Sequence, residues 1–119
     1  MPTSMMLVFS KSTSPETEAA YNRWYSEQHI QDVAKVAGVI SATRYRLEKG
    51  VPLLPGISGD HRGHLAIYEL EGRTPEELNA FADALRQALA SGAADIDPTL
   101  DMVDISASLA VPITPRVTA

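Results

Sequence analysis

The same helix-start signature occurs twice in this chain, each time directly after a short apolar segment. Ser-Pro-Glu at 14–16 follows the apolar run 5–11, and Thr-Pro-Glu-Glu at 74–77 follows the apolar run 64–70. Ser or Thr can cap a helix, Pro fits its first position, and Glu favours the positive end of the helix dipole. Each half of the chain therefore predicts a strand that leads into a helix.

The remaining segments complete the predicted order of strands and helices. The first helix is expected to run to about Ala37, and Gly38 suits the left-handed residue that follows a helix end. The β-branched segment 39–47 predicts a strand, and the Gly- and Pro-rich segment 48–62 predicts a long loop that can act as a lid or site wall. The second helix is expected to end near residue 92, and the alternating segment 101–112 predicts the last strand.

The resulting order, β-α-β-β-α-β, is that of the ferredoxin-like fold, an α+β class with a four-stranded antiparallel sheet and two helices on one face. At 119 residues the chain predicts a single domain over 1–119. The other sheet face is expected to be bare and apolar, which favours a homodimer with two sheets packed face to face.

Composition excludes several classes of function. Ten Lys and Arg against fifteen Asp and Glu give a net charge of −5, which argues against nucleic acid or an anionic membrane as partner. The chain has no cysteine, so disulfides, thiolate catalysis and cysteine-based metal sites are excluded. The apolar run at the N-terminus is too short for a signal peptide or a membrane span, so a cytoplasmic location is expected.

The first helix carries the residues most suited to chemistry. At 100° per residue, Tyr21, Tyr25, His29 and Asp32 fall within about 80° of one another on the face that should meet the sheet. Four polar side chains there require hydrogen-bond partners, which favours a polar pocket between helix and sheet. The alternative is that both tyrosines are packing residues with solvated hydroxyls and that His29 lies at a helix end.

Three further residues on the predicted strands could face this pocket. His64 opens a strand and shares a face with Tyr68, and Arg44 is a permanent forked donor for an acidic group or a phenolate. A solvent-exposed edge is the alternative for the arginine. His61 lies in the predicted loop, where a solvated side chain is expected. No metal-ligand, nucleotide-binding or nucleophile-elbow motif is present, so no metal and no cofactor are expected.

One stretch resembles a known family. Trp24-Tyr25, then His29 four residues later, Ile30-x-Asp32 and the turn Gly38-Val39 resemble the pattern W-Y-x-x-x-H-x-P-D, then P-G-V, of the EthD-like branch of the dimeric α/β-barrel superfamily. Gln31 and Ala37 stand where that pattern has proline. Proline would break the helix after the histidine, whereas glutamine need not.

The resemblance implies a homodimer with a small-molecule pocket in each protomer. It makes His29 the expected general acid or base, helped by Tyr25 and Asp32, with Tyr21, Trp24, Arg44, His64 and Tyr68 as substrate-binding residues. The expected activity is that of a cofactor-independent lyase, cyclase or isomerase acting on an oxygenated hydrophobic, aromatic or polyketide-like molecule. A cofactor-free monooxygenase, a haem protein with His29 or His64 as axial ligand, and a non-catalytic ligand-binding module are the alternatives.

Overall fold

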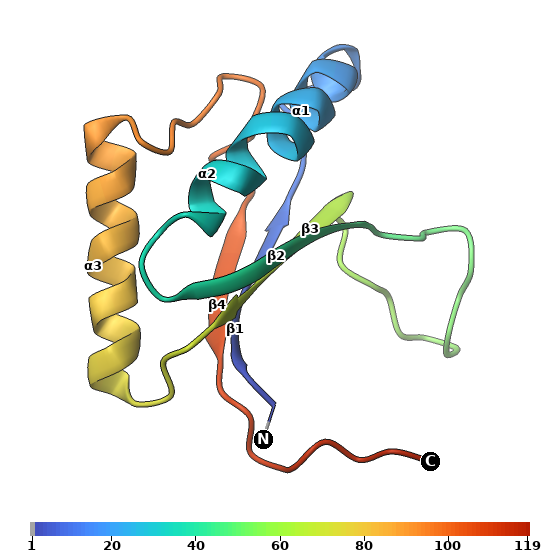
Figure 1. The fold of residues 1–119 in the computed structure, drawn as a ribbon. Helices are drawn as coiled ribbons and strands as arrows, with labels where there is room; N and C mark the ends of the chain where they lie inside the picture. The colour runs from blue at the N-terminus through green and yellow to red at the C-terminus, as the bar shows by residue number, and fades with distance from the viewer. Residues whose placement is uncertain (1) are drawn as a thin grey trace.

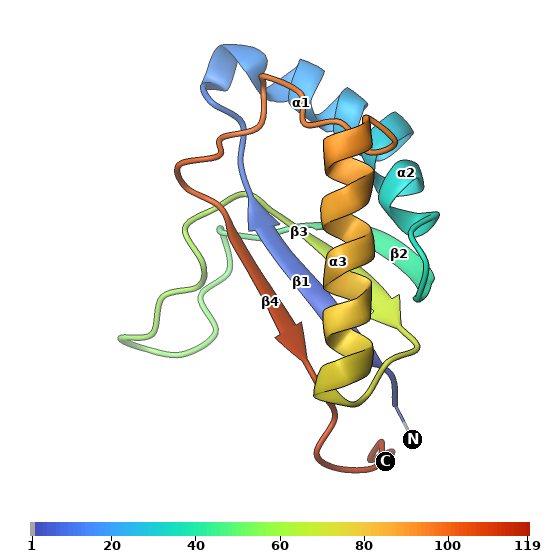
Figure 2. The same cartoon turned by 90° about the vertical axis from the view of Figure 1, so that its left-hand side faces the viewer.

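The computed structural model describes residues 2–119, which form one four-stranded antiparallel sheet covered by helices on one side (Figure 1 and Figure 2). The strands, in chain order, are β1 (Ser4–Ser10), β2 (Val39–Arg46), β3 (His64–Leu70) and β4 (Ser106–Ala110). Across the sheet they lie in the order β2-β3-β1-β4, and each neighbouring pair is antiparallel. The ferredoxin-like α+β fold predicted from the order of segments is therefore confirmed.

The first helical segment is continuous but not uniform. A 3-10 turn, η1 (Pro15–Thr17), leads into α1 (Glu18–Trp24), then into a π-helical turn, η2 (Tyr25–His29), and finally into α2 (Ile30–Ala34). The helix does not break at Gln31, as expected for a residue that keeps its backbone N–H. It ends one turn earlier than the predicted Ala37, and Gly38 follows with a φ of 96°.

The second helix, α3 (Pro75–Ser91), begins and ends as its sequence predicts. The Thr74 hydroxyl accepts the Glu77 backbone N–H at 3.2 Å, while the Glu77 carboxylate accepts the Thr74 N–H at 3.1 Å. This reciprocal capping box satisfies backbone donors that the first turn leaves free. Gly92 ends the helix with a φ of 83°, a left-handed conformation that glycine adopts without strain.

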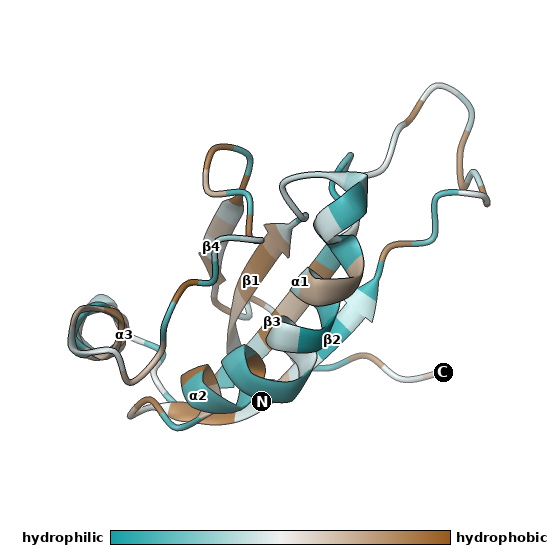
Figure 3. Cartoon of the chain, turned by 90° about the horizontal axis from the view of Figure 1, so that it is seen from above, coloured by the Kyte–Doolittle hydropathy of each residue, from teal (hydrophilic) through white to brown (hydrophobic). Residues whose placement is uncertain are grey.

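The helix-facing side of the sheet forms the core. Alternate residues of β1 and β3 are buried there: Ser4, Met6, Val8 and Ser10 on β1, with Ala66, Tyr68 and Leu70 on β3. Figure 3 shows that apolar residues concentrate in β1, β3 and β4, whereas β2, α1 and α2 carry more hydrophilic ones. The register pairs Arg44 with Ala66 and Arg46 with His64, so two arginines of β2 lie on the helix-facing side.

The last strand is shorter than the predicted 101–112. The Asp101 carboxylate accepts the backbone N–H groups of Val103 and Asp104, at 2.9 and 3.1 Å, which folds this stretch into a turn. Asp and Asn side chains commonly compete with a strand ladder in this way. The predicted loop 48–62 is confirmed, and it extends away from the body of the molecule in Figure 1. No helix within residues 2–119 combines the length and the apolar character needed to span a membrane.

Candidate functional site

Three tyrosines form a buried layer between the first helical segment and the sheet. Tyr21, Tyr25 and Tyr68 are each at most 2% exposed. The Tyr21 hydroxyl lies 2.6 Å from the Ser10 hydroxyl, and the Tyr25 and Tyr68 hydroxyls lie 3.3 Å apart. The aromatic rings of Tyr21 and Tyr25 meet edge to face, with centroids 5.9 Å apart. Each phenol therefore has a hydrogen-bond partner inside the protein, as buried phenols require.

Arg44 reaches from β2 across this layer to the helix. One of its NH groups donates to the Ser26 hydroxyl at 2.7 Å, and the other donates to the Asn22 side-chain oxygen at 3.0 Å. Its guanidinium lies 4.4 Å from the centroid of the Tyr25 ring and 5.3 Å from that of Tyr21. A cation at such distances is attracted by the electron-rich face of a phenol. Arg44 thus holds helix and sheet together at the tyrosine layer.

The two histidines named as site residues flank this layer on different sides. The His29 ring stacks on Trp24, with centroids 4.6 Å apart, and meets the edge of Tyr25 at 4.9 Å. The His64 ring lies 5.4 Å from the Tyr21 ring. We define the aromatic cluster as Tyr21, Trp24, Tyr25, His29, Arg44, His64 and Tyr68. These are seven of the eight residues predicted for the site.

Asp32 is the predicted site residue that the structure leaves apart. It is half-buried, and within the described chain no hydrogen bond joins it to His29. The π turn before it changes the rotation of the helix, so Asp32 does not follow His29 on the buried face. Its charge nevertheless acts on the His29 ring by raising the pKa of that imidazole.

Burial favours the neutral forms of the histidines and tyrosines of the aromatic cluster. Loss of solvation lowers the pKa of His29, against the opposing effects of the nearby Asp95 backbone and the Asp32 charge. Burial also lowers the pKa of His64, and the charge of Arg44 lowers it further. Burial raises the pKa of Tyr25 well above its ordinary value and that of Tyr68 to about 12. At neutral pH the cluster therefore offers two neutral imidazoles beside phenols that keep their protons.

Some polar atoms of the cluster have no partner. Four buried side-chain nitrogen or oxygen atoms within residues 2–119 make no hydrogen bond, and three of them belong to the aromatic cluster: His29 Nδ1, Arg44 Nε and His64 Nδ1. The fourth is Ser4 Oγ. An unsatisfied buried donor or acceptor costs about 1–3 kcal/mol. Such a cost concentrated in one place is typical of a functional site rather than of a packing core.

Two cavities lie near the sheet, and only one of them meets the aromatic cluster. The larger, about 400 Å³, lies between β1, the end of β4 and the C-terminal tail, and Arg116 is the one ionisable side chain that lines it. The smaller, about 290 Å³, is lined by His64 together with Glu18, Lys49 and residues that follow β1. His29 lines neither of these two cavities, so the cluster meets the smaller one through His64 alone.

Sequence reasoning missed the polar partners that hold the cluster in place. These are Ser10, Asn22 and Ser26. Ser10 pairs with His64 in the β1–β3 register, and its place on the buried face follows from the alternation along β1. Nothing in the sequence pattern marks Asn22 and Ser26, because their role depends on the direction in which Arg44 reaches.

The described residues hold no group of three or more His, Asp or Glu side chains that could ligate a metal ion. The fold and the cluster define a ferredoxin-like α+β protein with a buried, polar and aromatic candidate site. No protein-family model and no curated protein matches the chain.

Among solved structures, the chain is similar to a "putative monooxygenase" from Shewanella loihica PV-4. The identity is 19% and the TM-score 0.48, over 97% of this chain and 99% of that one. A likeness this low says nothing of the activity of the present protein.

Proposed function

We propose that the protein is a cofactor-independent enzyme that moves a proton on a small oxygenated, largely apolar molecule, as a lyase, cyclase or isomerase similar to EthD-like proteins. The observation that carries this proposal is the concentration of unpartnered polar atoms around Tyr21 and Tyr25. A polar ligand can satisfy groups that the protein itself leaves unpaired. Proton transfer through an imidazole and a phenol requires no metal or cofactor.

In this proposal His29 is the general acid or base, as the resemblance implies. Its lowered pKa leaves the ring neutral at pH 7, so that it can accept a proton. Tyr25, 4.9 Å away between ring centroids, keeps its proton and can donate to an oxygen that becomes negative. General acid–base catalysis contributes about 10²–10⁴-fold to the rate. Asp32 is a positioning residue, which acts through its charge on His29.

The test is proton exchange in deuterated water, followed by proton NMR, with a panel of enolisable ketones, lactones and phenols. We expect the wild-type protein to catalyse exchange at one carbon of a responsive compound. His29→Gln should lose about 10²-fold or more of that rate. Glu27→Gln is the control, since Glu27 is an exposed residue of the same π-helical turn and lies outside the cluster. Exchange that survives His29→Gln within a few fold would contradict the role of His29.

Two other outcomes would identify the alternative functions. Oxygen consumption in step with product formation would indicate a cofactor-free monooxygenase that uses the same cluster. Saturable binding of a panel compound without any exchange would indicate a ligand-binding module. In that case His29→Gln would change the affinity for the compound, and neither protein would catalyse exchange.

We also propose that two copies of the chain pack through the uncovered sheet face. This face carries apolar side chains on three neighbouring strands: Met5, Leu7, Phe9, Tyr45, Leu65 and Ile67. Tyr45 is 49% exposed, and an apolar face of this extent is unusual for a monomer. A second copy offers a face of the same chemistry and shape.

Light scattering after size-exclusion chromatography tests the dimer. We expect a mass of twice 12.8 kDa for the wild type and a shift toward the monomer for Ile67→Lys. Val103→Lys is the control, because Val103 is 98% exposed and lies outside the sheet. A monomeric wild type at micromolar concentration would refute the dimer.

A further inference from the structure

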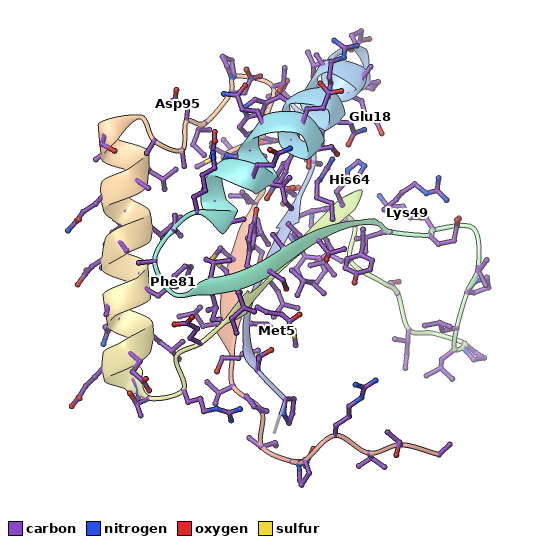
Figure 4. The ribbon with its side chains drawn as sticks, in the orientation of Figure 1. Met5, Glu18, Lys49, His64, Phe81 and Asp95 are labelled. Atoms are coloured by element: carbon purple, nitrogen blue, oxygen red, sulfur yellow. The ribbon has the colours of Figure 1, made fainter. Side chains whose placement is uncertain are left out.

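The smaller cavity lies at the end of the sheet where β1 ends and β3 begins, beside the start of the first helical segment. Its volume is about 290 Å³, at the lower end of the range for small-molecule pockets. Glu18, His64 and Lys49 line it from a helix, a strand and a loop, and Figure 4 shows the three close to one another on this side of the molecule. Three separate elements therefore contribute chemically distinct side chains to one small space.

Of the two lysines that line this cavity, one is paired with carboxylates within the described residues and the other is not. The Lys11 ammonium, which also lines the cavity, lies 3.3 Å from the Asp104 carboxylate and 3.9 Å from that of Asp101. Lys49, by contrast, donates to the His61 backbone carbonyl at 2.6 Å and has no carboxylate within salt-bridge distance in the described part of the chain. A lysine held by a neutral carbonyl keeps its full charge and two further N–H donors.

The charges that act on His64 are mostly positive. The charges of Arg44 and Arg46 act on its ring from β2, and that of Lys49 acts from the loop. Glu18 of α1 is the opposing negative charge, and the Tyr21 ring packs against the imidazole from the helix side. The three cations disfavour a proton on His64, and burial adds to their effect on its pKa. The same field favours a negative group near the ring.

We propose that this cavity binds a small organic acid, whose carboxylate lies between Lys49 and His64. His64 is half-buried and lines the cavity, and it also touches Tyr21, so an acid seated here lies at the edge of the aromatic cluster. The inference thus names the substrate class for the proposed function and rests on it only in taking His64 as part of the site. Binding is measured without turnover, so its failure is distinguishable from failure of the His29 chemistry.

Proton NMR of the histidine rings tests the proposal directly, because the chain has three histidines. Their signals are assigned with single His→Gln variants. Acetate, benzoate and phthalate are titrated, each beside its uncharged amide, at constant ionic strength. We expect the carboxylates to shift the His64 signals saturably, together with those of His61, which also lines the cavity, and to leave those of His29 in place. The amides should bind at least about fivefold more weakly, since they lack the charge.

Variants that each remove one charge test whether the cavity attracts negative groups. Lys49→Met should weaken carboxylate binding by about two- to fivefold, the amount expected for one exposed ion pair. Glu18→Gln should strengthen it by a similar factor, because it removes the opposing charge. Lys35→Met is the matched control and should change nothing, since Lys35 is an exposed lysine at the far end of the first helical segment. Lys49, Glu18 and Lys35 are all exposed, so these variants are expected to fold.

Three results would overturn the proposal. The first is equal shifts from carboxylates and amides, and the second is a Lys49→Met variant that binds as well as Lys35→Met. The third is a shift confined to signals other than those of His64. Weaker carboxylate binding by Glu18→Gln would likewise contradict the proposed charge effect, because the change removes a negative charge from the lining.

Discussion

Replacement of Arg44 by methionine tests whether the aromatic cluster is held by this residue or merely contains it. The change removes two short hydrogen bonds from a charged donor, at 2.7 Å to Ser26 and 3.0 Å to Asn22, and a guanidinium 4.4 Å from the Tyr25 ring. Hydrogen bonds to charged groups contribute about 1.5–3 kcal/mol each, and a cation over an aromatic ring about 0.5–2 kcal/mol. The charge of Arg44 is partly desolvated, which offsets part of the gain. We therefore expect a net loss of about 2–3 kcal/mol in the free energy of unfolding.

Arg46→Met is the matched control on the same face of the same strand. Arg46 is 79% exposed on its side chain and makes one ion pair, at 3.3 Å to a Glu48 carboxylate that is itself 61% exposed. Exposed pairs of this kind contribute about 0–1 kcal/mol. Urea unfolding at a fixed protein concentration, with linear extrapolation, measures both variants. Equal losses in the two variants would refute the reasoning. A more stable Arg44→Met protein would show that the fold carries the charge at a cost, as binding sites often do.

Two further predictions concern the His29 ring, and a third concerns the cap of α3. Because burial lowers the pKa of His29 below its ordinary 6.5, quenching of Trp24 fluorescence by the protonated ring should have a midpoint below pH 6.5 and vanish in His29→Gln; a midpoint above 6.5 would contradict the burial argument. The same shift means that the unfolded chain binds more protons just below pH 6.5, so stability should fall as the pH is lowered through that window and level off below the folded-state pKa; urea midpoints that rise on acidification would exclude this linkage. Thr74→Ala removes the cap of α3 and should lower the free energy of unfolding, measured in urea, by about 1 kcal/mol. No measurable loss would mean that water accepts the Glu77 N–H in place of the Thr74 hydroxyl.

The elements of the fold were predictable because their signals are local. The capping sequences at 14–17 and 74–77, the glycines at 38 and 92 and the apolar runs 5–11 and 64–70 each act within a few residues. The extent of the last strand was not predictable from alternation alone. Asp101 fits a strand pattern equally well, but its carboxylate instead binds two backbone N–H groups that a ladder would need.

Much of the candidate site was also predictable from periodicity, with Arg44 as the exception. Tyr21, Tyr25 and His29 recur every four residues, and all three are buried. For Arg44 the sequence left both a solvent-exposed strand edge and a ligand contact open. The register with Ala66 places it on the helix-facing side, and its hydrogen bonds to Asn22 and Ser26 turn it toward the helix. Such long-range pairings depend on the assembled sheet and not on any local pattern.

The π turn explains why Asp32 lies off the buried face, where the helical wheel placed it with the tyrosines. In an α-helix, a spacing of four residues advances by 40° beyond a full turn, so Tyr21, Tyr25 and His29 would drift around the axis. A π turn takes up more residues per turn, which returns His29 toward the line of the tyrosines. Asp32 follows His29 along a regular α-helical turn, so the same change rotates it off that line, where it is half-buried. His29→Gln and Asp32→Asn should therefore differ sharply, with loss of proton exchange in the first and a modest change in its pH profile in the second. Equal losses would mean that the two side chains act as a hydrogen-bonded pair, whereas in the described chain Asp32 acts on His29 through its charge alone.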